Sequence, residues 1–308
     1  MVIFVVNLRN KIKIMFPKFH GLGVAMVTPF KKNLQVDYEA LVKVFNHIQT
    51  GADYVVVQGT TGESVTITKA EKKKILETVK TNNHKKIPIV YGIGGNDTKK
   101  VLEEINETNL EGVDAILSVC PYYNKPGKRG VITHFKEIAD ASPVPIFLYN
   151  IPSRTGINLT SDAVAELSQH PNIIGIKEAS CIIEQCMEIH RDCPKDFLLI
   201  SGDDVQSLPI IALGGVGVMS VVGNAYPIEF GEVIHTCLKG DFKTASNLIS
   251  KFLRIDPLLY EEGNPVGVKK ILEIRGIIKS YVRPPLYAAT KDLEKRQIEV
   301  LKRDGFSI

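Results

Sequence analysis

The chain has 308 residues, of which 44% are hydrophobic and 23% charged, a composition typical of a globular protein with a sizeable core. One α/β barrel of ~250 residues folds as a single domain, so the length is compatible with that class. The formal net charge is only +4, and no basic run alternates with aromatic residues. The sequence therefore gives no indication of a nucleic-acid-binding protein. The mild positive charge suits small anionic ligands.

The first residues predict an N-terminal extension over 1–18, in which apolar residues are mixed with Arg9, Lys11 and Lys13. The apolar run before Asn7 is too short to span a bilayer, and no small-residue cleavage site follows it. Met15 is an alternative start site for translation, which would make the first 14 residues a dispensable extension. We therefore expect a cytoplasmic protein with no membrane contact.

Five cysteines are present, and they cannot all pair. None forms a Cys-x-x-Cys motif, and their spacing does not suit a zinc site, so we expect no metal. Small buried hydrophobic residues in a reducing compartment are the expected role. The five are Cys120, Cys181, Cys186, Cys193 and Cys237.

From Gly21 onward, short runs rich in Val, Ile and Leu alternate with segments of helical periodicity, as in parallel strands covered by helices. Thr68 and Glu71 have the spacing of a capping box at one helix start. Right-handed crossovers would close the strands into a (β/α)8 TIM barrel over 19–239. A doubly wound open sheet is the alternative, but no GxGxxG motif follows the first strand. The predicted strands are 23–27, 54–58, 87–91, 115–119, 146–149, 173–177, 197–201 and 217–222.

After about Lys239 the strand pattern stops, and amphipathic stretches predict helices over 241–262, 265–279 and 291–304. We expect a C-terminal helical extension over 240–308, packed on the barrel. On an earlier helix, one apolar stripe predicts core packing. Its members are Ile182, Ile183, Cys186, Met187 and His190.

The unusual residues fall where predicted strands end, which is where TIM barrels place their functional groups. Lys177 closes one apolar run, so its amine would meet apolar walls that favour the neutral, nucleophilic form. On position alone, a surface lysine is the commoner alternative. Tyr149 ends the preceding strand and could exchange protons with that amine, or be a core tyrosine.

Two further loops offer groups that could bind a carboxylate. Thr60 and Thr61 lie between glycines that let the backbone approach a ligand, although an ordinary turn has the same pattern. Arg154 follows a proline in a rigid loop, and its guanidinium fits a carboxylate or a salt bridge. Asp203 and Asp204 suggest a general base or metal ligand, but helix capping is the better interpretation.

Four segments, in this order and spacing, resemble the dihydrodipicolinate synthase family: 59–63 (GTTGE), 121–125 (PYYNK), 149–154 (YNIPSR) and 175–179 (GIKEA). The resemblance extends from Phe19 to about Leu286. It implies Schiff-base condensation of pyruvate with (S)-aspartate 4-semialdehyde, a step of lysine biosynthesis, without a metal or organic cofactor. The alternative is another pyruvate-dependent aldolase, such as N-acetylneuraminate lyase or a keto-deoxy-sugar acid aldolase. A non-catalytic barrel is disfavoured because the site residues are all present.

The resemblance also implies residue roles. Lys177 matches the Schiff-base lysine and Tyr149 the proton-transferring tyrosine, with Thr60 and Tyr123 as its relay partners. Tyr123 matches a tyrosine that reaches the neighbouring subunit, so a homo-oligomer, dimer or tetramer, is implied. The positions matching substrate-binding residues are Thr61 for the pyruvate carboxylate, Arg154 for the semialdehyde carboxylate, and Gly202 and Met219 for main-chain contacts.

Some relatives in this family are inhibited by lysine at a subunit interface, and Asn96 and Tyr122 match residues of that site. Where the lysine-sensitive pattern has histidine and glutamate, this chain has Lys69 and Lys100. Cations facing the ammonium groups of lysine repel it. We therefore expect weak or absent inhibition by lysine.

Overall fold

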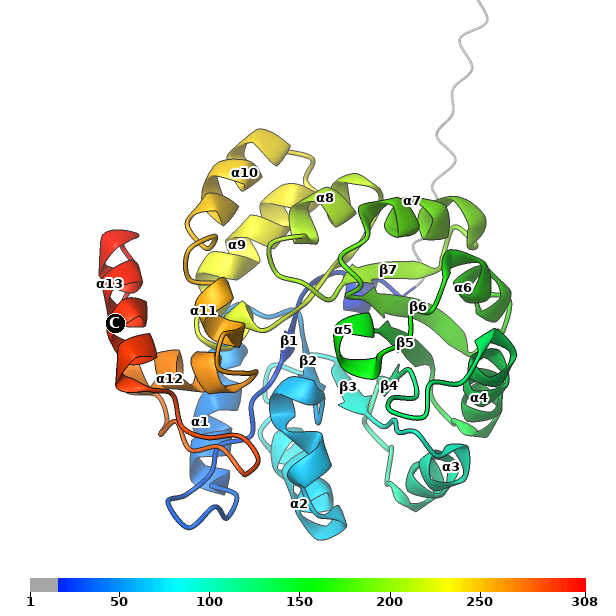
Figure 1. Cartoon of the computed structure of the whole chain (residues 1–308), viewed down its shortest axis with the longest axis horizontal. Coiled ribbons are helices and arrows are strands. Elements are labelled where there is room, and N and C mark those ends of the chain that lie inside the picture. The colour runs from blue at the N-terminus through cyan, green and yellow to red at the C-terminus, as the bar shows by residue number, and fades with distance from the viewer. Residues whose placement is uncertain (1–15) are drawn as a thin grey trace, which may run out of the picture.

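The structure is a computed structural model that describes residues 16–308. Eight parallel strands pair in sequence order, and the last pairs with the first, so the sheet is a closed barrel (Figure 1). This closure confirms the predicted TIM barrel and excludes the open sheet. The strands are β1 (Gly21–Ala25), β2 (Tyr54–Val57), β3 (Ile89–Gly92), β4 (Ala115–Val119), β5 (Ile146–Asn150), β6 (Ile173–Glu178), β7 (Leu198–Ser201) and β8 (Gly217–Ser220).

Each strand lies within two residues of its predicted position at both ends. Long helices cover the outside of the barrel, and the short helix α5 (Pro152–Thr155) follows β5 at the barrel opening (Figure 1). The predicted capping box of Thr68 and Glu71 is present at the start of α2. The outer helices are α1 (Tyr38–Ile48), α2 (Lys69–Thr81), α3 (Thr98–Glu107), α4 (Lys128–Ala141), α6 (Ser161–Leu167), α7 (Ile183–Asp192), α8 (Ser207–Ala212) and α9 (Pro227–Leu238).

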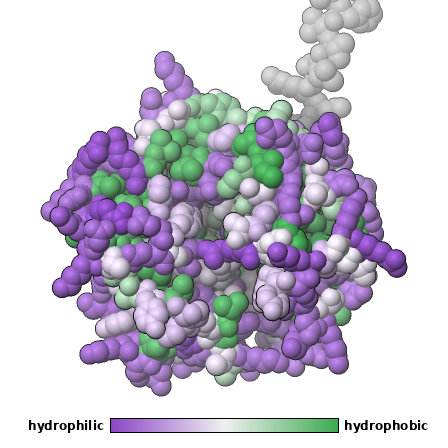
Figure 2. Space-filling view, in the orientation of Figure 1, coloured by the Kyte–Doolittle hydropathy of each residue, from purple (hydrophilic) through white to green (hydrophobic). Residues whose placement is uncertain are grey.

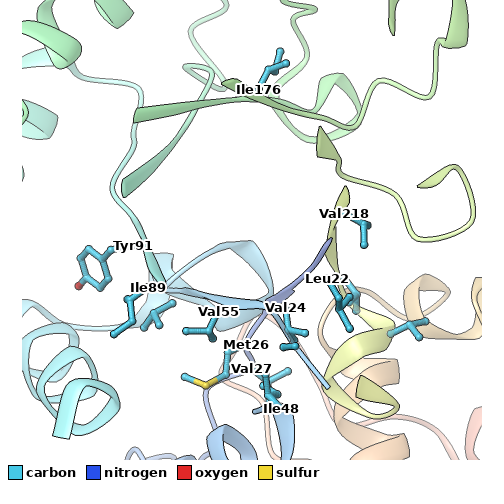
Figure 3. Close-up of a cluster of buried hydrophobic side chains, with 14 of the residues drawn as sticks. Leu22, Val24, Met26, Val27, Ile48, Val55, Ile89, Tyr91, Ile176 and Val218 are labelled. Carbon is cyan, nitrogen blue, oxygen red and sulfur yellow. The ribbon is translucent and has the colours of Figure 1, made fainter. Parts of the chain in front are cut away.

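The barrel separates two hydrophobic clusters because successive side chains on a strand point to opposite faces. The inner cluster fills the barrel and includes Phe19, Tyr54 and Tyr149. The outer cluster packs the strands against the helices, and the labelled strand side chains, such as Val55 and Ile176, point away from the ring of strands (Figure 3). Strand residues with alternating orientation therefore build both cores, which explains why the predicted runs are continuously apolar.

The helices after the barrel lie against one side of it, at the left of Figure 1. Proline divides the first predicted stretch, because Pro257 begins a separate short helix. We call residues 240–308 the C-terminal extension. Its helices are α10 (Phe242–Ser250), α11 (Pro257–Tyr260), α12 (Val266–Ile274) and α13 (Lys291–Arg303).

Two details of the sequence analysis were wrong. On α7 the side chains of Met187 and His190 are exposed, as is Ile182 before the helix, while Gln185 and Ile189 are buried beside Cys186. The predicted apolar stripe is therefore rotated from the true buried face, because Ile182 precedes the helix and does not follow its period. Among the cysteines, all of which are free, Cys181 is exposed and the other four are buried.

The face of the molecule seen in Figure 1 is largely hydrophilic, with small hydrophobic patches (Figure 2). Across residues 16–308, no helix has the length and apolar character needed to cross a membrane. The same range contains no group of three or more His, Cys, Asp or Glu side chains arranged to hold a metal ion. The first 15 residues of the predicted N-terminal extension lie outside this range.

Candidate active site

Lys177 and Tyr149 are neighbours at the carboxyl ends of β6 and β5, where the strand register pairs them directly. Their side chains point into the barrel opening, and the Lys177 Nζ lies 4.5 Å from the centre of the Tyr149 ring. Lys177 is only 5% exposed. The structure therefore brings together the two residues that the sequence predicted as nucleophile and proton donor.

Lys177 differs from the other buried lysines in having no ionic partner among the residues that the structure describes. Lys269 contacts the carboxylate of Glu63, and Lys270 contacts Glu273 at 2.6 Å. Within residues 16–308, the Lys177 Nζ makes no ion pair and no hydrogen bond. Buried charges in proteins are normally paired, so the unpaired amine of Lys177 is left available for a ligand.

The residue after Lys177 points the opposite way and anchors the two strand ends from outside the barrel. The Glu178 carboxylate accepts hydrogen bonds from the side chains of Asn150 and Gln185, and from the backbone of Ser180. Burial raises the pKa of Glu178, while these donors lower it. This network fixes the register of β5 against β6 and hence the position of Lys177.

Thr60 and Tyr149 line one pocket at the barrel opening, between the ends of β2 and β5. Gln58 lines it too, although the sequence analysis missed this residue. Its backbone is left-handed, with φ of 61°, and both amide atoms of its buried side chain have no hydrogen-bond partner within the described chain. The sequence did contain one signal for Gln58, because this polar residue directly precedes the GTTGE segment at the end of an apolar strand.

Thr61 is 2% exposed and lies in the turn Thr60–Gly62, which directly follows Gly59. Its Oγ1 accepts a hydrogen bond of 3.0 Å from Asn264 Nδ2, a residue of the C-terminal extension. Glu63 closes the turn in a left-handed conformation, with φ of 56°. Its buried carboxylate contacts Lys269 and accepts a 3.0 Å hydrogen bond from the Arg283 backbone.

Gly202 lies beside Lys177, and Met219 lies inside the barrel. The Gly202 amide donates to the Glu178 carbonyl at 2.7 Å, and a Cβ at Gly202 would lie 3.1 Å from Lys177 Cε. A side chain at this position would also meet Ala179 Cβ at 2.6 Å, so only glycine fits here. Met219 is fully buried in the inner cluster with Tyr149. Both positions are therefore next to the predicted nucleophile or its neighbour.

Tyr123 and Arg154 are not enclosed with these residues within one chain. Tyr123 lies in the loop after β4, is 89% exposed and has a left-handed backbone with φ of 73°. Arg154 is exposed on α5, and no ion pair within residues 16–308 involves its guanidinium. The side chains of Tyr123 and Arg154 can therefore contact a ligand or another molecule outside the barrel wall.

The interpretation of Asp203 and Asp204 as helix caps is only half correct. Asp203 accepts a 2.9 Å hydrogen bond from the Gln206 amide, as a cap does. Asp204 is buried, and its Oδ2 instead accepts from the amides of Val221 and Val222 after β8. The sequence could not predict this contact, because it joins two separate strand ends.

Asp204 also lies near Asp256 of the C-terminal extension, and both carboxylates bury an oxygen that has no hydrogen-bond partner within the described chain. Burial and the charge of Asp204 raise the pKa of Asp256 to about 8, and burial raises that of Asp204. Burial likewise raises the pKa of Tyr260, with Asp204, Asp256 and Tyr149 contributing. The extension therefore places a proton-holding acidic pair next to the barrel opening.

Asp256→Asn should make the protein more stable at neutral and alkaline pH. A carboxyl whose pKa is raised on folding stabilises the fold below its unfolded pKa, near 4, and loses that contribution as pH rises through the folded pKa. The amide does not ionise, so its advantage should grow between pH 4 and pH 8, to roughly 1–3 kcal/mol. Urea unfolding at both pH values measures this. Glu299→Gln, at an exposed carboxylate, should show no such trend.

The closed parallel barrel and the pocket at the carboxyl ends of its strands define a TIM-barrel enzyme. The model of the dihydrodipicolinate synthetase family matches residues 18–303. A 4-hydroxy-tetrahydrodipicolinate synthase of Cytophaga hutchinsonii is 49% identical over 89% of this chain and 93% of its own length. The chain belongs to the dihydrodipicolinate synthetase family.

Solved structures of family members agree with this assignment. The chloride-inhibited dihydrodipicolinate synthase of Acinetobacter baumannii, in complex with pyruvate, matches with a TM-score of 0.90 and 34% identity over 94% of this chain and 99% of that chain. The Cyanidioschyzon merolae enzyme with lysine bound matches with a TM-score of 0.90 and 35% identity, over the same two shares. The order and closure of the strands are thus those of this family.

Proposed function

We propose that Lys177 forms a Schiff base with pyruvate and that the surrounding residues condense this adduct with (S)-aspartate 4-semialdehyde. The chain is an enzyme with the activity of its relatives, 4-hydroxy-tetrahydrodipicolinate synthase, in lysine biosynthesis. One observation supports the role of Lys177 above all. It is a buried lysine without a carboxylate partner in residues 16–308, at the carboxyl end of a barrel strand.

The chemistry follows from a neutral amine. Lys177 adds to the ketone carbon of pyruvate, and loss of water gives an iminium that withdraws electrons from the methyl group. A methyl proton then leaves to give an enamine, whose carbon attacks the aldehyde of the second substrate. The amino group of that substrate finally displaces Lys177 by attacking the same imine carbon, which closes the ring and restores the free lysine.

Tyr149 is proposed as the group that moves protons during these steps. Its ring lies under the Lys177 amine, and its side chain shares a pocket with Thr60. Tyr123 would complete the relay from a second copy of the chain, since it is exposed and is not among the described residues that line this pocket. This assignment makes the active form a homodimer or a larger assembly of dimers.

The substrate carboxylates are assigned to Thr61 and Arg154. The buried Thr61 hydroxyl accepts a hydrogen bond and donates none within residues 16–308, so its proton is free for the pyruvate carboxylate. Arg154 has no ion pair in the same range and offers a guanidinium to the semialdehyde carboxylate. Main-chain groups of Gly202 and Met219 would line the remaining wall. No metal or organic cofactor takes part in this scheme.

Borohydride trapping tests the proposal directly. Incubation with pyruvate and borohydride should add one reduced pyruvyl group to the intact protein, and peptide mapping should place it on Lys177. Condensation with aspartate semialdehyde should greatly exceed cleavage of N-acetylneuraminate, which the rival aldolase activity would favour. An adduct on any other lysine, or no adduct, would overturn the assignment.

Lysine should inhibit the enzyme weakly or not at all. Lys69 and Lys100 are exposed on or near the starts of α2 and α3, where their ammonium groups contact Glu107 at 2.8 Å and Asp97 at 3.6 Å. Their charges oppose a bound diamine, and both acidic partners are already engaged. A lysine titration of the initial rate measures this, and half-inhibition below a millimolar concentration would contradict it. The double variant Lys69→His and Lys100→Glu should become more sensitive than the natural chain.

A further inference from the structure

The turn that carries Thr60 and Thr61 is held from outside the barrel by the C-terminal extension. Asn264 donates to Thr61 Oγ1 at 3.0 Å, and Lys269 contacts the buried Glu63 carboxylate at the end of the same turn. Arg283 adds hydrogen bonds to the Thr66 carbonyl at 2.6 Å and to Glu71. More than 200 residues of sequence separate Asn264 and Thr61, so the contact exists only in the complete fold.

The direction of the Asn264 hydrogen bond decides what the Thr61 hydroxyl can do. A threonine hydroxyl has one proton and can both accept and donate. Because Asn264 Nδ2 supplies a proton to Oγ1, the threonine's own proton must point elsewhere. Within residues 16–308 that proton has no acceptor, although the side chain is 98% enclosed, which is a costly state unless a ligand provides one.

We propose that Asn264 is a positioning residue that fixes the Thr61 hydroxyl as a donor to the pyruvate carboxylate. The inference rests on the proposed role of Thr61. It gives the C-terminal extension a part in binding the keto acid, through a side chain that need not touch the substrate. A carboxylate oxygen suits this donor, because a hydrogen bond to a charged oxygen is stronger than one to a neutral acceptor.

Two substitutions at Asn264 separate this role from a merely structural one. Asn264→Ala removes the donor and leaves the Thr61 hydroxyl free to rotate, so the KM for pyruvate should rise roughly tenfold. Asn264→Asp keeps the side-chain volume but can only accept. It should take the Thr61 proton and place a negative charge near the carboxylate, so its KM should rise further than that of the alanine variant. A packing role predicts the reverse order, because aspartate preserves the shape.

A double variant at Thr61 and Asn264 completes the test. Thr61→Val should itself raise the pyruvate KM, and adding Asn264→Ala to it should cause no further rise, because the threonine hydroxyl through which Asn264 acts is gone. The turnover number should change by less than about threefold in the Asn264 single variants. Gln297→Ala is the matched control. This buried amide donates to Leu258 and Gly267 within the extension, so its loss should leave the pyruvate KM unchanged.

The outcomes distinguish the inference from the function on which it rests. If Thr61→Val leaves the pyruvate KM unchanged, the proposed role of Thr61 is wrong. If Thr61→Val raises it but Asn264→Ala and Asn264→Asp do not, or if their order is reversed, Asn264 does not position the hydroxyl. Because aspartate is nearly isosteric with asparagine, at least one Asn264 variant should fold for this comparison, and thermal unfolding confirms it.

Discussion

Lys177→Met will reduce the rate of condensation by at least about 10³-fold and will abolish the pyruvate adduct trapped by borohydride. Methionine fills the volume of the lysine stem but has no amine to add to the ketone. The fold should remain intact, because Lys177 has no ion pair within residues 16–308 that the substitution could break. Its thermal unfolding midpoint should equal or exceed that of the natural chain, since a buried amine without a partner opposes folding.

Lys177→Arg is the companion variant. Arginine keeps a positive charge at the barrel opening, but its guanidinium stays protonated and cannot form the imine. It should therefore be as inactive as the methionine variant. Appreciable condensation by either protein, with correct folding confirmed by circular dichroism, would show that the nucleophile is another residue.

The same substitution at a second buried lysine should have the opposite effect. Lys269→Met will destabilise the fold by roughly 3–5 kcal/mol, because it leaves the Glu63 carboxylate buried and uncompensated. Lys269 is fully buried, contacts Glu63 and donates a 2.9 Å hydrogen bond to the Tyr281 carbonyl. Burial lowers the pKa of Lys269, and the Glu63 carboxylate opposes this effect by favouring the charged ammonium.

Urea unfolding near pH 7 measures this loss, and two further variants identify its cause. Adding Glu63→Gln to Lys269→Met should restore much of the lost stability, because the stranded charge disappears. Lys136→Met breaks an ion pair of similar length with Glu166 on the surface and should cost at most about 1 kcal/mol. Equal losses at the two lysines would refute the argument from burial.

The barrel could be predicted from sequence because its strands are continuous apolar runs that both cores require. The position of Lys177 followed from the same pattern, since a charged residue that ends such a run must lie at the barrel opening. The predicted ends of β1 and β8 lie two residues beyond the observed ends, Ala25 and Ser220. Apolar character continues past the last strand hydrogen bond there, for example at Val27 and Val222, which are buried outside the strands.

The contacts of the C-terminal extension could not be predicted, because local patterns carry no information about partners so distant in sequence. Asn264, Asp256 and Lys269 all act on residues from the ends of other strands or turns. One signal was present. Lys269 and Lys270 interrupt a helix that is apolar except for Glu273, and a lysine on a buried helix face requires a carboxylate partner. The sequence left the identity of that partner open.

The dependence of the Thr60–Thr61 turn on Asn264 and Lys269 has a consequence for protein synthesis. The ribosome completes all eight strands, including Lys177 on β6, before it adds the residues that hold this turn. A nascent chain that ends after α9 would thus carry Lys177 and Thr61 without the side chain proposed to position the Thr61 hydroxyl. Competence for the reaction should arrive late in translation, when the last fifth of the polypeptide has emerged and docked.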